Sequence, residues 1–423
     1  MNIKRIYQGW QESFANTVLF GLVFGLTNLV SYLFLVVAGR SLLPAEFGVF
    51  NALLGLLTIG GIFASSIQVA VTREVTKDVG RDTLVSLIRA VWQIAIPGTA
   101  LATIAVIPFA GRIGLTTLQV VLCGVTLLTM ILGSATIGFL VGLGKVRAQA
   151  DLNFFGTIAR LAVGWLFMSA GFGVSGALAG YAINYLLVLI LAYAKSLHVV
   201  NRPEALTGKA AAPLRIEGAT VAIFVLTFAP FTLDQFMVQF FNPSLGGDYA
   251  ATATIAKLAF FAAYPVTAVA YPALLALSDR RSRVRALATA SAAVILIAGT
   301  LALLIHAFPQ GVTQLFFGDR FSNASDHVGM LAFGIACFSL SALGAHAQIA
   351  WGGRGGMVPS VATVAFAILL FALRHGSLAT VIENQVWIYA LQLVLVWGLL
   401  AVTVMRSVRH ERATKAAPPA TGF

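Results

Sequence analysis

The sequence predicts an all-α polytopic membrane protein with about 12 transmembrane helices. Hydrophobic residues make up 59% of the 423 residues and charged residues only 10%. The mean hydropathy is +0.91, which lies far outside the range of soluble globular domains. The apolar residues are also grouped into runs of about 20, which is the length that a helix needs to cross a bilayer.

The apolar runs form two sets, and each run is bounded by Gly, Pro or charged residues. The first set lies near residues 14–37, 47–71, 84–109, 117–141, 150–171 and 174–194. The second set lies near residues 218–241, 248–277, 284–307, 327–350, 357–373 and 386–405. We therefore expect a six-helix lobe at 1–194, a basic cytoplasmic linker at 195–217, a second six-helix lobe at 218–405 and a disordered cytoplasmic tail at 406–423.

Positively charged loop residues predict the orientation of the chain. If the N-terminus is cytoplasmic, the outer loops hold only four cations, Arg40, Arg112, Arg320 and Arg374. All other loop cations then lie inside, as expected because Lys and Arg keep short loops in the cytoplasm. This pattern predicts a multi-pass protein of the cytoplasmic (inner) membrane with both termini in the cytoplasm. It also explains the net charge of +12 without a nucleic-acid partner.

Two opposite charges interrupt neighbouring runs at the start of the second lobe. Asp234 and Lys257 flank the turn FNPSLGGDY, and helical rise places each of them roughly 10 to 13 Å below the same surface. An ionisable group within a span costs on the order of 3 kcal/mol or more, so such groups usually face a partner or a cavity. The pair is predicted to interact, either as a static lock or as part of a transport pathway in which Asp234 serves coupling or gating.

The fifth run carries a polar stripe. Asn153, Thr157, Arg160 and Gly164 recur on one helical face, with Arg160 near the middle of the membrane. An arginine at that depth needs an anionic partner, which could be a protein carboxylate or a substrate phosphate that suits the planar guanidinium. On the first run, Asn28 could line a cavity or form an interhelical hydrogen bond.

Two stretches resemble the polysaccharide flippases of the multidrug, oligosaccharidyl-lipid and polysaccharide (MOP) exporter superfamily. These stretches are AGRSLLPAEFGVFNALLGLLTIGGIFASSIQVAVTREVTK and LDQFMVQFFNPSLGGDYAATATIAKL, which are similar to the family's first and its seventh-to-eighth hairpins. The resemblance implies two six-helix lobes around a central cavity. It also implies translocation of a polyprenyl-diphosphate-linked oligosaccharide, a cell-envelope polysaccharide precursor, from the inner to the outer leaflet. Arg160 and Lys257 would then hold the diphosphate, and Asn153, Thr157 and Asn28 would contribute to the same cavity.

Other function classes remain as alternatives. A cation-coupled multidrug antiporter of the MATE type is the closest, although such proteins often carry an acid on the first span, where this chain has none. A glycosyltransferase would need acids on a large outer loop, and the longest one, residues 307–326, offers only Asp319 and Asp326. We therefore expect no enzymatic activity, and no cofactor or metal site.

A non-transporting scaffold for a glycan-assembly complex also fits the sequence. The expected partners are membrane lipids and the lipid-linked glycan, together with a glycan polymerase or glycosyltransferases.

Overall fold

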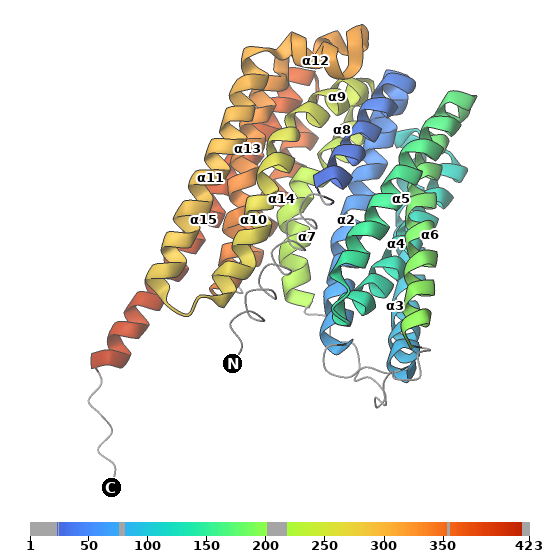
Figure 1. Ribbon diagram of the computed structural model, residues 1–423. Coiled ribbons are helices and arrows are strands. Elements are labelled where there is room, and N and C mark those ends of the chain that lie inside the picture. The colour runs from blue at the N-terminus through green and yellow to red at the C-terminus, as the bar shows by residue number, and fades with distance from the viewer. Residues whose placement is uncertain (1–22, 24, 76–80, 201–217, 353–355, 417–423) are drawn as a thin grey trace, which may run out of the picture. The chain divides into compact units, whose positions relative to one another are not determined.

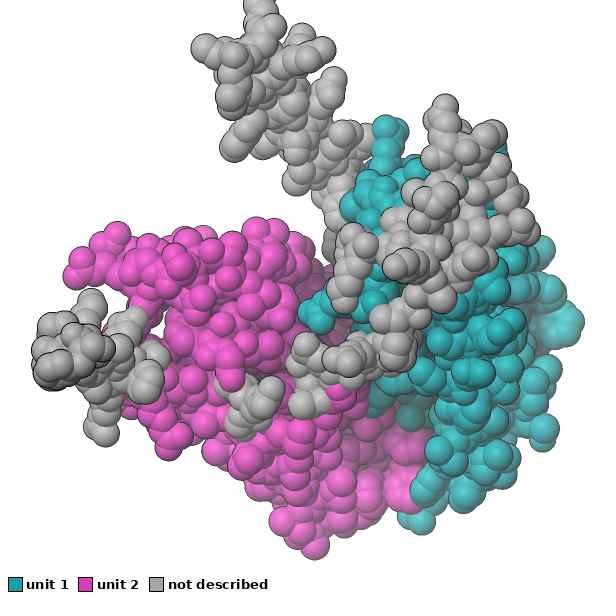
Figure 2. All heavy atoms as spheres, turned by 90° about the horizontal axis from the view of Figure 1, so that it is seen from below, with its two compact units in different colours: residues 1–216 teal, residues 217–423 magenta. Residues whose placement is uncertain are grey.

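The protein is helical, and no strand occurs in the part of the chain that the structure describes (Figure 1). The computed structural model describes residue 23 and residues 25–75, 81–200, 218–352 and 356–416. The chain forms two compact units, unit 1 at Met1–Ile216 and unit 2 at Glu217–Phe423 (Figure 2). The division falls within the segment 195–217 that the sequence predicts as a linker.

Unit 1 is a bundle of long helices. Its described elements are a helix at residues 25–41, α2 (Pro44–Val75), α3 (Arg81–Ile113), α4 (Thr117–Gly142), α5 (Val146–Phe167), the π-helical turn η1 (Met168–Phe172) and α6 (Gly173–Val200). Helix α4 packs against both α2 and α6, and α5 lies along α6. Buried aliphatic and aromatic side chains such as Ile67, Met130 and Phe139 fill the core between these helices.

Unit 2 contains several helices that are interrupted within a predicted span. Its elements are α7 (Gly218–Thr232), α8 (Asp234–Phe241), η2 (Pro243–Leu245), α9 (Gly246–Ala256), α10 (Leu258–Ala276), α11 (Arg280–Ala307), α12 (Pro309–Phe317), η3 (Gly318–Phe321), α13 (Ser322–Ala350), α14 (Met357–Leu373) and α15 (Leu378–Ala416). Helix α13 packs against α10, α11 and α15, and α14 contacts α7 and α15. Helix α13 is accordingly the most buried of the long helices that pass as membrane spans.

The helices agree with the predicted apolar runs. Eight described helical stretches are long and apolar enough to cross a membrane, or nine if α7 and α8 together form one bent span. Every predicted run from residue 47 onward overlaps a helix or a broken helix pair. The first run is helical at residues 25–37, and most of its remainder lies outside the described residues.

Three boundaries differ from the prediction. Residues 307–326 were expected to form the longest outer loop, and α12 and η3 occupy most of this segment. Helix α6 continues to Val200, and α15 continues to Ala416, into the tail that was expected to be disordered. The sequence RHERATKA in this tail is rich in Ala, Arg, Glu and Lys, which favour helix even without an apolar face. Residues 201–217 and 417–423 lie outside the described part.

Glycine permits the close approach of α2 and α4. A Cβ atom added at Gly138 would lie 2.5 Å from the backbone oxygen of Gln68 and 3.1 Å from its Cα. The Thr72 hydroxyl donates a hydrogen bond of 3.0 Å to the Gly138 carbonyl at the same crossing. Small residues serve this purpose in membrane helices because they allow backbones to come into direct contact.

We expect Gly138→Ala to destabilise unit 1. The added methyl group must push the two helices apart, and such overpacking typically costs about 1 to 3 kcal/mol. Gly98→Ala on α3 is the matched control, since a Cβ there would meet nothing within 4 Å. Thermal unfolding of the purified variants measures the difference. Equal melting temperatures for the two variants would contradict the close contact.

An aspartate caps α11 at the turn after α10. The Asp279 carboxylate accepts hydrogen bonds from the Ser282 backbone N–H (2.9 Å) and the Ser282 hydroxyl (2.8 Å). The backbone hydrogen bond, followed by the side-chain one, lowers the pKa of the Asp279 carboxyl below its usual value. Capping of this kind satisfies an N–H group that has no partner within the helix.

Loss of this cap should be visible as faster hydrogen exchange at the start of α11. Because the folded pKa is depressed, the cap stabilises the helix end above the unfolded pKa and is lost as pH falls through the folded pKa. We expect Asp279→Ala to speed hydrogen exchange of the Ser282 amide at neutral pH. Asp279→Asn should keep the cap and remove its dependence on acidic pH. An unchanged exchange rate in Asp279→Ala would contradict the capping role.

Candidate functional site

The span formed by α7 and α8 bends at Leu233. The two helix axes meet at 51°, three residues after Pro230. Leu233 N–H still bonds to the Ala229 carbonyl (2.8 Å), but the next helix starts afresh at Asp234. The Pro230 carbonyl instead accepts a hydrogen bond from the Gln385 side-chain amide on α15 (2.7 Å). A side chain from a neighbouring helix thus replaces the backbone donor, which is how broken spans are tolerated in membranes.

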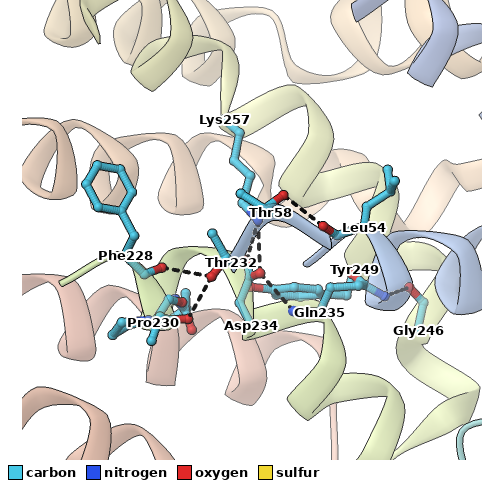
Figure 3. Close-up of polar contacts among 12 residues, drawn as sticks. Leu54, Thr58, Phe228, Pro230, Thr232, Asp234, Gln235, Gly246, Tyr249 and Lys257 are labelled. Carbon is cyan, nitrogen blue, oxygen red and sulfur yellow. Dashed lines mark hydrogen bonds and ion pairs between the residues drawn. The ribbon is translucent and has the colours of Figure 1, made fainter. Parts of the chain in front are cut away.

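A buried ion pair connects this bend to a second helix break. The Lys257 ammonium, between α9 and α10, lies 2.9 Å from Asp234 Oδ1 and 2.8 Å from Oδ2 (Figure 3). The Asp234 side chain is fully buried, and the Lys257 side chain is 17% exposed. The prediction from helical rise that Asp234 and Lys257 interact is confirmed.

Further donors complete the surroundings of the Asp234 carboxylate. The Tyr249 hydroxyl on α9 donates to Oδ2 (2.9 Å), and the Gln235 backbone N–H donates to Oδ1 (2.8 Å). The Gln235 side chain in turn donates to the Gly246 carbonyl (2.8 Å), so that α8 and α9 are held together (Figure 3). Oδ1 therefore accepts two hydrogen bonds, and Oδ2 accepts one and contacts the ammonium, which offsets much of the cost of burying the charge.

An aromatic ring contacts the lysine as well. The Lys257 Nζ lies 4.7 Å from the centre of the Phe231 ring, and Phe231 stacks on Phe338 of α13 at 4.6 Å. The quadrupole of an aromatic face attracts a cation, most strongly where water is excluded. The ammonium is thus held by a carboxylate and a ring.

In unit 1, two glycines bring α5 and α6 together around the predicted polar stripe. A Cβ at Gly180 would lie 2.8 Å from the Arg160 carbonyl and 2.9 Å from the Gly164 Cα. A Cβ at Gly164 would in turn lie 2.5 Å from the Phe34 ring. This close crossing places Tyr181, the neighbour of Gly180, beside the Arg160 guanidinium.

The Arg160 side chain is enclosed by aromatic rings. Its Cζ lies 4.5 Å from the centre of the Tyr181 ring and 5.4 Å from that of Phe34, and the residue is only 6% exposed. The Tyr181 and Phe34 rings contact each other edge to face at 5.5 Å. Cation–π contacts compensate part of the cost of burying a guanidinium, but they do not use its N–H donors.

Two of the three nitrogen atoms of the Arg160 guanidinium have no acceptor among the described residues. Both Nε and Nη2 are fully buried, and neither has a hydrogen-bond partner among the described residues. These two atoms form one edge of the guanidinium, which is the edge that binds two oxygens of a carboxylate or phosphate side by side. The sequence allows two kinds of partner for Arg160, a protein carboxylate or a substrate phosphate. Within the described part of the chain, no carboxylate bonds to Nε or Nη2. An anion from outside the protein fits the unfilled edge.

The structure places the other predicted site residues in different environments. Thr157 is buried on the same face of α5 as Arg160, and Asn153 is half-buried one turn earlier. Asn28 is exposed on the helix at residues 25–41. Arg160, Thr157 and Asn153 belong to unit 1, whereas Asp234 and Lys257 belong to unit 2.

Sequence reasoning did not identify three aromatic residues at these sites. Phe34 and Tyr181 contact Arg160 from two other helices, and Tyr249 contacts Asp234 from α9. Each lies in an apolar run where an aromatic residue is ordinary, so only the depth shared with a buried charge could have pointed to them. Tyr249 would have been the easiest of the three to predict, because it is the last residue of the stretch FNPSLGGDY between Asp234 and Lys257.

Solved structures identify the fold. Over 93% of this chain and 87% of the other, the structure is similar to the lipid II flippase MurJ in an inward closed conformation, with a TM-score of 0.71 and 13% identity. The chain shares the fold of this flippase. An inward-facing MATE multidrug transporter of the MOP superfamily matches with a TM-score of 0.61 and 14% identity, covering 88% of this chain and 94% of the transporter. A MOP superfamily transporter from Pyrococcus furiosus matches with a TM-score of 0.52 and 16% identity, covering 91% and 93%.

Comparisons by sequence give no relative. No protein-family model matches the chain, and no curated protein matches it. The fold shared with these structures confirms the expected architecture of an all-α membrane protein. At 13 to 16% identity it does not by itself define the substrate.

Proposed function

We propose that this protein is a flippase of the MOP superfamily that moves a polyprenyl-diphosphate-linked oligosaccharide from the inner to the outer leaflet by alternating access. The observation that carries the proposal is the unfilled Nε and Nη2 edge of Arg160, a buried cation in a membrane-spanning helix. A diphosphate supplies paired oxygens for this edge, and a prenyl chain keeps the substrate within the membrane. Such a substrate matches the chemistry of the site better than a cationic or neutral drug does.

The remaining predicted residues have auxiliary roles in this proposal. Thr157 and Asn153 continue the polar face of α5 from Arg160 toward one end of the helix, where hydroxyl and amide groups suit a sugar or a phosphate oxygen. Asn28 adds an exposed amide on the first helix. Lys257 would bind the diphosphate only after it separates from Asp234, which gives Asp234 its coupling or gating role.

The MATE-type antiporter is the second candidate, because MATE transporters share the fold. Exchange of a coupling cation requires an acid that can take up and release it. Asp234 is the fully buried acid of the described spans, and its two oxygens are already occupied by Lys257, Tyr249 and the Gln235 N–H. This arrangement favours the flippase over the antiporter.

The cellular setting follows from the same proposal. The protein would lie in the cytoplasmic membrane with both termini and the linker at 195–217 inside, as the distribution of loop cations predicts. Glycosyltransferases that build the lipid-linked glycan, or a polymerase that uses it, would be its partners. Labelling single cysteines near Arg283 from outside intact cells would contradict this orientation.

Reconstitution tests the function. Purified protein in liposomes is given a short-chain polyprenyl-diphosphate oligosaccharide, and an impermeant lectin or glycosidase reports the fraction that reaches the other leaflet. We expect flipping well above protein-free liposomes, and little flipping of the same glycan on a neutral lipid. Flipping no faster than in empty liposomes would overturn the proposal. Cation-driven efflux of a drug from the same vesicles would favour the antiporter, and neither activity would favour the scaffold.

A further inference from the structure

One face of α15 carries a line of buried polar groups within unit 2. Gln385, Tyr389 and Gln392 recur at helical spacing, and they are 1%, 0% and 0% exposed. The face continues through Val396 to Thr403, a rise of about 27 Å from Gln385 at 1.5 Å per residue. This length approaches the thickness of the hydrocarbon core of a bilayer.

The two glutamines are fixed by their amide nitrogens. The Gln385 Nε2 donates to the Pro230 carbonyl (2.7 Å), and the Gln392 Nε2 donates to the Thr227 carbonyl (2.8 Å), both on α7. These bonds leave the side-chain oxygens to find donors elsewhere. The Oε1 atoms of Gln385 and Gln392 and the hydroxyl of Tyr389 are all fully buried, and the Gln385 side chain lies beside the Tyr389 hydroxyl. No hydrogen bond of normal distance and angle reaches these three oxygens from the described residues.

The line has a charged group at one end. The Tyr389 hydroxyl lies in the neighbourhood of both Gln385 and Asp234, the acid of the buried ion pair. Besides Lys257, the Tyr249 hydroxyl also contacts this carboxylate.

A cavity lies at the other end of the line. It is small, about 10 Å³, which is room for about one water molecule. It is lined by Thr227 of α7, Gln348 of α13 and Val396 of α15, and it reaches Gly356 just before α14. The Gln348 side chain donates to the Thr403 hydroxyl (2.9 Å), whereas its Oε1 is buried without a partner. The cavity therefore begins beside Thr227, whose carbonyl binds Gln392, and ends near the turn between α13 and α14.

Unpartnered buried oxygens are unusual in proteins, and ordered water is the ordinary solution. Buried waters typically make about three hydrogen bonds to polar groups that otherwise lack partners. Nearly all buried polar groups in native proteins have a protein or water partner. Here four such oxygens lie within unit 2: Gln385 Oε1, Tyr389 Oη and Gln392 Oε1 on α15, and Gln348 Oε1 on α13.

We propose that unit 2 holds a file of internal water molecules between α7, α13 and α15. The file runs from the Asp234–Lys257 pair along Gln385, Tyr389 and Gln392 to the cavity beside Gln348. Through this file, solvent can reach the buried pair from the end of unit 2 where α13 ends and α14 begins. The route does not pass along the lipid-facing surface. The proposal concerns unit 2 alone and holds whatever substrate the protein carries.

Hydroxyl-radical footprinting by pulsed X-rays tests the file in the intact protein, because bound waters generate radicals where they sit. Tyr389 is the reporter, since it is fully buried but adjoins the proposed waters. Phe371 of α14 is also 0% exposed and is the dry reference. We expect Tyr389 to be oxidised several-fold faster than Phe371. Equal, slow oxidation of the two residues would overturn the proposal.

A block in the file supplies the second measurement. Gln392→Leu should lower oxidation of Tyr389 several-fold, and Gln348→Leu should do so from the cavity end. Thr363→Val is the matched control, because Thr363 is buried in the same unit but bonds to the Pro359 carbonyl (2.8 Å). Continued slow oxidation of Phe371 shows that each variant is folded. Unchanged oxidation of Tyr389 in both leucine variants would exclude this route.

Discussion

Asp234→Ala is expected to lower the free energy of unfolding by about 3 to 5 kcal/mol, because it leaves the Lys257 ammonium uncompensated in a membrane span. Lys257→Ala should have a similar effect, since the carboxylate would keep the contacts with Tyr249 and Gln235 but lose its cation. Thermal unfolding in nanodiscs and abundance in the membrane both measure the loss.

A double variant separates pairing from the loss of either charge. The reversed pair, Asp234→Lys with Lys257→Asp, should retain more folded protein than either single reversal. It should not reach the wild-type level, because the Gln235 N–H would then point at an ammonium group. If both single variants are harmless, the pair does not stabilise the protein.

The exposed pair of Arg374 and Glu383 provides a matched control. Its atoms are 3.0 Å apart, almost the same distance as in the buried pair, but both side chains are 46% exposed. Exposed pairs contribute about 0 to 1 kcal/mol because water screens them. Arg374→Ala should therefore barely change stability, and a loss equal to that of Asp234→Ala would contradict the importance of burial.

Arg160→Ala is expected to reduce flipping by roughly 10- to 150-fold, which corresponds to about 1.5 to 3 kcal/mol for hydrogen bonds to a charged group. Arg160→Lys should retain part of the activity, because it keeps the charge but lacks the two parallel N–H donors of the guanidinium. The flipping assay in liposomes measures the rate, and the accumulation of lipid-linked glycan in the inner leaflet measures it in cells.

A structural role for Arg160 predicts a different pattern. If the guanidinium only packs against Phe34 and Tyr181, Arg160→Ala lowers membrane abundance and thermal stability instead of the transport rate per molecule. Tyr181→Leu is the matched control, since it removes the closer ring and leaves the guanidinium in place. Normal abundance together with normal flipping in Arg160→Ala would defeat both interpretations.

The sequence was most informative about features that lie within one helix or within one hairpin. Counting residues from the turn FNPSLGGDY placed Asp234 and Lys257 at the same depth, and they form a pair. The polar stripe on α5 likewise identified Thr157 and Arg160 as buried residues of one face. In both cases the regular rise and rotation of a helix convert a spacing into a position.

Features that depend on several helices could not be predicted in this way. The rings around Arg160 come from residues 34 and 181, and no pattern within α5 points to them. The bend at Leu233 follows Pro230, but its geometry depends on Gln385, which is far away in the chain. Helix α12 was missed because PQGVTQLFF is too short for a span and was taken for part of a loop.

The pairing of Asp234 with Lys257 also bears on how the chain enters the membrane during synthesis. Each charge alone costs on the order of 3 kcal/mol at the centre of a span, so releasing the two segments into lipid one after the other would expose each charge in turn. Entering together as a hairpin, with Asp234 and Lys257 already neutralising each other, avoids this cost. The short turn at residues 242–245 allows such joint insertion, in which the Asp234–Lys257 contact forms before the two segments meet lipid.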